Sequence, residues 1–437
     1  MDTPICDFVR DYAKSETVRL HMPGHKGKYF LGVERLDITE IPGADSLYEA
    51  DGIIRQSEEN ASGLFGCPTF YSTEGSSQCI RAMLYLALLW AKERGKPPVI
   101  AAGRNAHKTF LTGAALLDLD VRWLYPKDGS YLSCNLTTEE VEGVLEAEKP
   151  AAVYLTSPDY LGNLADIAGI AEVCHRHGAL LLVDNAHGAY LRFCSPSWHP
   201  MDLGADVCCD SAHKTLPVLT GGAYLHCGSE FRDWAKNALA LFGSTSPSYL
   251  ILQSLDGANP CLASLPDRLE EFLPRVEAVR KKLAERGYIL YGQEPLKITI
   301  CAKPYGYTGQ ALAEILLEHH IVSEFADPDF LVLMLTPQNR QAELDKLTQV
   351  LLSIPGKTPI LEQPPRFRPG QRVCSPREAM LAHMQTVPVA ESQGRVLAAA
   401  TVGCPPAVPI VVSGERIDEY AIGCFHYYGI THCSVMK

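Results

Sequence analysis

Short apolar runs alternate with amphipathic stretches between about residues 68 and 226. Five runs are almost wholly apolar and end in polar or glycine-rich residues, as buried parallel strands do: 98–102, 151–156, 179–184, 206–209 and 222–226. Helical patterns lie between them. One opens at the capping box Thr137–Glu140, and another covers 166–177 and is closed by Gly178. The alternation predicts an α/β domain with a mostly parallel sheet.

A long amphipathic helix over 265–287 leads out of that domain. The runs 296–301, 308–319, 322–325, 330–335 and 340–353 then predict a smaller β-α-β-β-α unit. Five prolines in 355–374 are typical of a linker, and Pro376 suits the first turn of a final helix. We expect an N-terminal segment 1–45, a large domain 46–264, a small α+β domain 265–354, a linker 355–374 and a C-terminal domain 375–437.

Composition narrows the class of protein. The 437 residues are 46% hydrophobic and 21% charged, which indicates a globular chain and excludes collagen-like, coiled-coil or disordered classes. A net charge of −12 argues against binding nucleic acid or an anionic membrane surface. The chain has no apolar run of membrane-spanning length and no secretory pattern at its start, so we expect a cytoplasmic protein. The fifteen scattered cysteines predict free thiols and no metal site.

Three features that could bind a ligand or take part in a reaction lie at predicted strand ends, where open α/β sheets bind ligands. The loop before the helix 79–93 contains Gly75, Ser76 and Ser77, which suits a phosphate, although an ordinary helix cap has the same pattern. Asp184 ends an apolar strand, where the alternative is a carboxylate that caps a turn. Lys214 follows the strand 206–209, where the alternative is a solvated loop lysine.

The three features occur in the order needed to hold pyridoxal 5′-phosphate. A phosphate-binding loop anchors one end of this cofactor, an aspartate pairs with its protonated ring nitrogen, and a lysine forms the Schiff base. Lys214 follows Asp184 by thirty residues (214 − 184 = 30). The combination is more specific than any one of its parts.

Further motifs occur in one family order: His21–Gly27, 37–40, 45–47, 65–66, Gly75–Ser77, Arg104–Lys108, Thr156–Gly162, Asp184–Gly188, Ser211–Thr215, Thr245–Tyr249, 254–256 and Cys404–Glu415. On these residues the chain resembles the fold-type I pyridoxal-phosphate enzymes. Within them it is similar to the short form of the bacterial ornithine/lysine/arginine decarboxylases. The resemblance implies a mostly parallel seven-stranded sheet with helices on both faces, in a large cofactor-binding domain, followed by smaller C-terminal α+β domains.

The resemblance also implies roles for individual residues. Lys214 forms the Schiff base, Asp184 holds the ring nitrogen protonated, and His107 stacks on the ring. The phosphate is bound by Gly75, Ser76, Ser77 and Ser211, with Thr245 or Ser246 reaching it from a second subunit. Thr156 and Ser157 approach the phenolic oxygen. His213 contacts the phosphate or moves a proton, Lys214 being the other candidate for the proton donor, and His187 lies near the ring in a structural or catalytic role.

The implied activity is α-decarboxylation of arginine, lysine or ornithine to an amine and carbon dioxide, by a homodimer or a higher oligomer of dimers. Two alternatives stay open at this point. One is another fold-type I reaction on an amino acid, such as transamination, aldol cleavage or desulfuration. The other is a catalytically degenerate protein that binds the cofactor.

The chain departs from the usual family pattern at Asn185, Asp159, Leu161, Gly221 and Cys404. These positions surround the expected substrate side, so the choice of amino acid is open. Four acidic residues are candidates for contacting a distal amine or guanidinium: Glu40, Asp45, Glu324 and Asp327.

Overall fold

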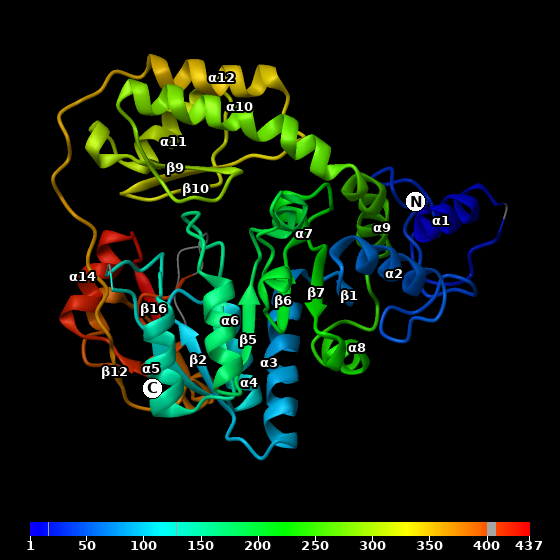
Figure 1. Cartoon of the computed structure of the whole chain (residues 1–437), viewed down its shortest axis with the longest axis horizontal. Coiled ribbons are helices and arrows are strands. Elements are labelled where there is room, and N and C mark those ends of the chain that lie inside the picture. The colour runs from blue at the N-terminus through cyan, green and yellow to red at the C-terminus, as the bar shows by residue number, and fades with distance from the viewer. Residues whose placement is uncertain (16, 128, 400–407) are drawn as a thin grey trace. The chain divides into compact units, whose positions relative to one another are not determined.

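The structure is a computed structural model that describes residues 1–437 except 16, 128 and 400–407 (Figure 1). The chain divides into two compact units. The first comprises residues 1–95 and 180–268, and the second comprises 96–179 and 269–437. The domain limits expected from the sequence stay a prediction.

The first unit contains four neighbouring strands in the order β1-β7-β6-β5. They are β1 (Thr69–Ser72), β5 (Leu180–Asp184), β6 (Val207–Asp210) and β7 (Ala223–Cys227). Strands β5 and β6 are parallel, whereas β7 runs antiparallel to both β6 and β1. Every residue of β5 is buried, because both faces of a parallel strand are covered. Its last residue therefore places a carboxylate at the end of a fully buried strand.

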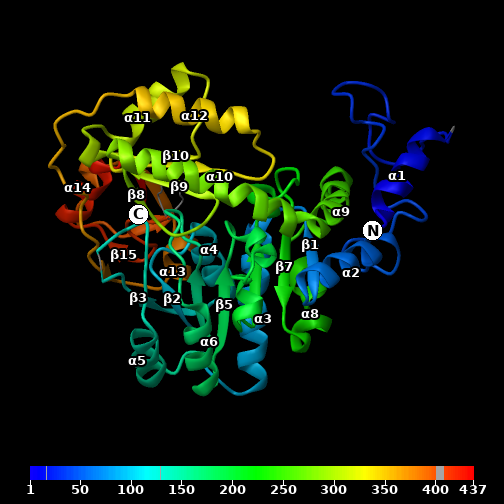
Figure 2. The same cartoon turned by 45° about the horizontal axis from the view of Figure 1, so that its top comes forward.

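Helices and short 3₁₀ turns surround these strands. They are α1 (Pro4–Lys14), α2 (Ile53–Phe65), α3 (Gly75–Glu93), η1 (Ala189–Phe193), η2 (Pro200–Leu203), α7 (Ala212–Thr215), η3 (Ser229–Phe231), α8 (Arg232–Ala240) and α9 (Tyr249–Ala263). Helix α3 packs along β5, β6 and β7, and α2 packs on β1. The loop after α1 stands clear of the neighbouring helices (Figure 2). Large apolar side chains in this loop are exposed, among them Leu20, Phe30 and Leu31.

The second unit contains three parallel strands in the order β4-β2-β3. They are β2 (Val99–Gly103), β3 (Asp120–Leu124) and β4 (Ala152–Thr156), with helices α4 (Lys108–Leu117), α5 (Thr138–Glu148) and α6 (Ile167–Arg176). Together with the four strands above, they account for the seven expected strands. The capping box at Thr137 is confirmed: its hydroxyl accepts the Glu140 N–H, and the Glu140 carboxylate accepts the Thr137 N–H.

The rest of the second unit follows helix α10 (Leu265–Arg286). An antiparallel sheet in the order β10-β11-β9-β8 is formed by β8 (Ile289–Tyr291), β9 (Lys297–Cys301), β10 (Phe325–Ala326) and β11 (Phe330–Met334), with η4 (Lys303–Tyr305), α11 (Gly309–Glu318) and α12 (Gln341–Ser353). The C-terminal part adds β12 (Gln371–Arg372), α13 (Pro376–Leu381), β13 (Met384–Pro388), η5 (Val389–Glu391), β14 (Leu397–Ala399), β15 (Glu415–Arg416), α14 (Glu419–Tyr427) and β16 (His432–Met436).

The strands predicted from apolar runs are confirmed to within one or two residues, except that the run 322–325 gives only the two-residue β10. Eight strands have no counterpart in that prediction: β1, β3, β8 and the five strands β12 to β16 of the C-terminal part. Helix α3 begins at Gly75, four residues before the start expected at Cys79. None of the helices in the described ranges is long and apolar enough to cross a membrane. Cys404 lies outside the described residues.

Candidate functional site

Lys214 lies in the short helix α7, which follows β6 directly. The turn is tight because Lys214 N–H donates to the Ser211 carbonyl, so the side chain begins four residues after the end of a buried strand. The lysine Nζ is 3.0 Å from Nε2 of His187, which is itself buried. A primary amine and an imidazole in direct contact can exchange a proton.

Asp184 is the last residue of β5 and is only 2% exposed. Its Oδ1 accepts the Ala186 N–H at 3.2 Å and the Cys209 thiol at 3.6 Å. Cys209 is the residue opposite Asp184 in β6, so the sheet register itself fixes this contact. A buried carboxylate held in this way suits a cationic N–H partner.

The loop at the start of α3 has the features of an anion-binding site. Gly75 adopts φ +72°, and the space where its Cβ would lie is open for 4 Å. The Ser211 hydroxyl donates to the Ser76 hydroxyl at 2.8 Å, so two hydroxyl groups meet at the positive end of the helix. The Glu74 carboxylate, which precedes this helix start, accepts the Ser244 N–H.

Gly221 connects this loop to the lysine segment. Its carbonyl accepts the Gly75 N–H at 2.7 Å, and its φ is +101°. A Cβ here would lie 3.0 Å from Ile251 Cδ1 and 3.1 Å from the Thr73 carbonyl oxygen. The departure from the family pattern at this position therefore has a backbone reason: only glycine fits without strain.

Asn185 takes part in a buried polar network that the sequence did not reveal. Its Nδ2 donates to Asp210 Oδ1 at 2.7 Å. Oδ2 of the same aspartate is 3.1 Å from His199 Nε2 and 3.0 Å from His226 Nε2. The two histidines and Asp210 are fully buried. No sequence motif indicated this cluster, since its four members come from four separate segments.

Three further candidates of the first unit are His213, Thr245 and Ser246. His213 donates through Nδ1 to the Gly222 carbonyl at 2.9 Å, which assigns its tautomer. Thr245 and Ser246 are exposed in the loop before α9. The exposed loop is compatible with contacts made to another chain.

Three candidates lie in the second unit. His107 caps α4: its Nδ1 accepts the Thr109 N–H at 3.2 Å. The Ser157 hydroxyl accepts the Ala165 N–H at 3.0 Å. The Thr156 hydroxyl is buried and has no hydrogen-bond partner among the described residues. Of these three side chains, Thr156 is the one whose polar atom makes no hydrogen bond to the described residues.

The family model "Orn/Lys/Arg decarboxylase, major domain" matches residues 3–300, and the model of the C-terminal domain of the same family matches residues 369–432. The chain belongs to the Orn/Lys/Arg decarboxylase family. The arginine decarboxylase of Bacillus subtilis (strain 168) is 29% identical over 458 residues, which is 96% of this chain and 92% of that protein. That of Halalkalibacterium halodurans is 29% identical over 95% of this chain and 91% of that protein.

A solved structure shows the same fold. The crystal structure of the Francisella novicida lysine decarboxylase LdcF matches with a TM-score of 0.81 and 17% identity, over 100% of this chain and 81% of that chain. The predicted fold-type I architecture is thereby confirmed for this Orn/Lys/Arg decarboxylase family member.

Most of the acidic candidates for a distal amine already have partners in this family member. Asp45 accepts the backbone N–H groups of Gly52 and Ile54, and Glu40 accepts the Ser46 hydroxyl. The Tyr160 hydroxyl donates to Glu324 Oε1 at 2.8 Å. Asp327 differs, because one of its carboxylate oxygens has no partner among the described residues.

Asp159 and Leu161 are explained by the turn after β4. The Asp159 carboxylate accepts the N–H groups of Leu161 and Asn163, both at 2.9 Å. Leu161 is buried in a small apolar cluster with Phe325 and Val332. Both departures therefore serve the local structure of this turn.

Proposed function

We propose that the chain is a pyridoxal-phosphate-dependent decarboxylase that converts a basic amino acid (arginine, lysine or ornithine) to the corresponding amine and carbon dioxide. One observation carries the proposal. The first unit holds an amine at Lys214, a buried carboxylate at Asp184 and the paired hydroxyls of Ser76 and Ser211, each at the end of a strand or the start of a helix. Membership of the Orn/Lys/Arg decarboxylase family and the arginine decarboxylase relatives support it.

These residues fit the chemical groups of pyridoxal phosphate. Ser76, Ser211 and the N–H groups at the start of α3 match its phosphate, Asp184 matches its ring N–H, and Lys214 matches its aldehyde. When bound, the cofactor supplies an electron sink for the bond broken at the α-carbon of the substrate. Gly75, Ser77, His107, Thr156, Ser157, Thr245 and Ser246 stay predicted cofactor contacts.

The side chains around Lys214 account for the proton movements that the reaction needs. His187 Nε2, at 3.0 Å, can take a proton from the lysine ammonium and so leave a nucleophilic amine. Asp184, shielded from water, keeps a proton on the group that it binds. Because the Nδ1 of His213 is used by Gly222, Nε2 is the nitrogen of that ring that can hold or move a proton. Lys214 and His213 are therefore the two candidates for returning a proton to the product carbon.

The active form is proposed to be a homodimer or an oligomer of dimers in the cytoplasm. Exposed apolar side chains in the loop after α1 support a protein partner, since exposed apolar surface is a feature of interfaces. The exposed position of Thr245 and Ser246 is compatible with contact to the cofactor of a second subunit.

Replacing the lysine tests the proposal most directly. We expect Lys214→Ala to lose the visible absorbance of the bound cofactor and all release of carbon dioxide from arginine, lysine and ornithine, because the variant lacks the amine that forms the covalent link. Lys282→Ala, which removes an exposed lysine of α10, is the matched control and should behave like the wild type. Assays for keto acid, aldehyde and sulfide in the same samples distinguish the alternative reactions. Carbon dioxide release by Lys214→Ala would refute the assignment.

A further inference from the structure

An apolar cavity of about 110 Å³ lies in the second unit. Its walls are Tyr131, Leu132, Gln310, Phe325, Ala326, Asp327, Pro328, Val408, Ile410, Tyr428 and Ile430. Three of these side chains are aromatic, and the rings of Tyr131 and Tyr428 meet edge to face with their centroids 6.3 Å apart. Asp327 is the one charged side chain among these wall residues.

Asp327 is 6% exposed, and its two carboxylate oxygens differ in their hydrogen bonding. Oδ1 accepts the N–H groups of Asp329 at 2.8 Å and Phe330 at 2.6 Å. Oδ2 has no hydrogen-bond partner in the described part of the chain. A buried carboxylate oxygen without a partner is costly, so a group that binds it gains the interaction without displacing one.

The nearby basic residue makes its hydrogen bonds to other groups. Lys303 Nζ lies 3.1 Å from Asp329 Oδ1 and 3.4 Å from Glu362 Oε2, and it donates to the Tyr427 hydroxyl. Its hydrogen-bonding capacity is therefore used by other groups.

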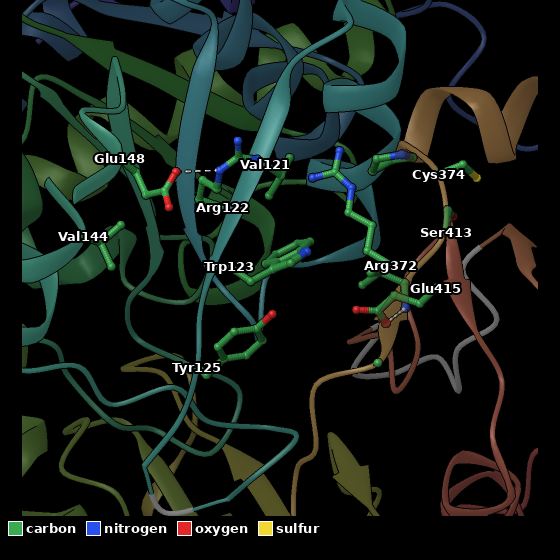
Figure 3. A pocket seen from close by; sticks show the side chains of 13 residues that line it. Val121, Arg122, Trp123, Tyr125, Val144, Glu148, Arg372, Cys374, Ser413 and Glu415 are labelled. Carbon is green, nitrogen blue, oxygen red and sulfur yellow. Dashed lines mark hydrogen bonds and ion pairs between the residues drawn. The ribbon is translucent and has the colours of Figure 1, made fainter.

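A second cavity of this unit, of about 310 Å³, shows the opposite arrangement (Figure 3). Its arginines are already paired: Arg122 contacts Asp120 at 2.6 Å and Glu148 at 2.9 Å, and Arg372 contacts Asp120 at 3.0 Å. This larger cavity therefore has no uncompensated charge on these arginines with which to select a charged ligand.

We propose that the cavity at Asp327 binds the ammonium or guanidinium end of a short aliphatic organic cation, with Asp327 as its counter-ion. The apolar wall takes the alkyl part, and the aromatic rings favour a cation through their π faces. An engineered cavity of roughly 150 Å³ holds a benzene-sized guest, so this one suits a chain of a few carbon atoms. A divalent metal ion is disfavoured, because such ions require several oxygen ligands and the wall offers a single carboxylate.

The source of this cation rests on the proposed function. Decarboxylation of a basic amino acid involves two such cations: the distal end of the substrate and the released amine. The ligand class itself rests on the cavity alone, so a direct binding measurement tests it without any turnover.

The test is calorimetric titration of the purified holoenzyme with n-butylamine, and with 1-butanol as the uncharged probe of similar size. We expect n-butylamine to bind clearly more tightly than 1-butanol. Asp327→Asn, which keeps an oxygen for the two backbone N–H groups, should weaken n-butylamine binding by about tenfold or more and leave 1-butanol binding unchanged. At Gln310, an exposed wall residue, Gln310→Glu should tighten and Gln310→Lys weaken n-butylamine binding, each by about two- to fivefold.

Kinetics then separate the two sources. If the substrate supplies the cation, Asp327→Asn raises KM for the basic amino acid and n-butylamine competes with it. If a separate amine supplies it, KM is unchanged and n-butylamine binds equally well in saturating substrate. Either result supports the site. Binding of n-butylamine no tighter than that of 1-butanol, or unchanged by Asp327→Asn, overturns it, whether or not the protein is a decarboxylase.

Discussion

Asp210 in the first unit and Asp327 in the second are both buried carboxylates, yet their surroundings give them opposite acidities. Burial alone would raise the pKa of Asp210, but His199 and His226 outweigh it and lower that pKa. Burial raises the pKa of Asp327 to about 6 from an ordinary value of 3.8, and the two backbone N–H groups that it accepts do not cancel this effect. The difference shows that the side chains around a buried acid, and not its depth alone, decide in which direction its pKa moves.

The surroundings of Asp210 also include a histidine, His226, whose tautomer can be assigned. Burial lowers the pKa of His226 against the charge of Asp210, so the ring is neutral near pH 7. Its Nε2–H donates to Asp210, and its Nδ1, 3.0 Å from the Thr69 hydroxyl, is then an acceptor. His199, Cys208 and Asp210 place possible metal-ligand atoms within 4.8 Å of one another, but Asp210 is already held by the N–H donors.

The largest expected effect is that of removing the carboxylate of Asp210. Asp210→Ala leaves two buried imidazoles and the Asn185 amide without their acceptor, and should lower the free energy of unfolding by about 3–5 kcal/mol. Urea unfolding followed by circular dichroism measures the change. A loss below about 1 kcal/mol would show that the network contributes little, and the contrast with Asp327 would fail.

A pH series on Asp327→Asn sharpens the other side of the comparison. The folded protein holds this proton more tightly than the unfolded chain, so the contribution of Asp327 to stability is fully present below pH 3.8 and is lost as the pH rises to about 6. The Asn side chain does not ionise, so the variant does not lose stability in this way as the pH rises. Its stability relative to the wild type should therefore rise by about 3 kcal/mol between these limits, at ~1.4 kcal/mol per pKa unit. Parallel stability curves for the two proteins would contradict the raised pKa.

The smallest expected effect concerns the tautomer of His226. Thr69→Val removes the hydroxyl that lies 3.0 Å from Nδ1 and donates to the Cys67 carbonyl, and should cost about 1 kcal/mol in the free energy of unfolding. Unfolding curves in urea measure it, with Thr112→Val, at a partly buried hydroxyl that donates to the Thr109 carbonyl, as the control for loss of an ordinary hydrogen bond. A loss equal to that of the control would mean that the tautomer is fixed by Asp210 alone.

Much of the fold could be predicted because apolar runs and their polar ends follow directly from burial. Strand β3 was not predicted, because Asp120 and Arg122 interrupt its apolar pattern and are paired with each other. The start of α3 was placed too late, since Gly75 and the two serines resemble a loop in sequence but already form its first turn.

In the candidate site, too, some residues could be predicted from the sequence, whereas their contacts required the structure. Lys214 and Asp184 could be proposed from their places after buried strands, and the contact of Lys214 with His187 required the structure. The partnership of Asn185, His199 and His226 with Asp210 joins separate segments, so no local pattern encodes it. The unpartnered oxygen of Asp327 depends on what its neighbours do with their own hydrogen bonds, which a sequence does not state.

The hydrogen bond between Gly221 and Gly75 has a consequence for how the enzyme can change over evolution. It joins the two loops through main-chain atoms alone. Mutations that exchange neighbouring side chains do not remove the donor or the acceptor of this bond. The link between the loop at the start of α3 and the lysine segment is thus insulated from such changes, so the surrounding side chains can diversify while the two loops stay joined.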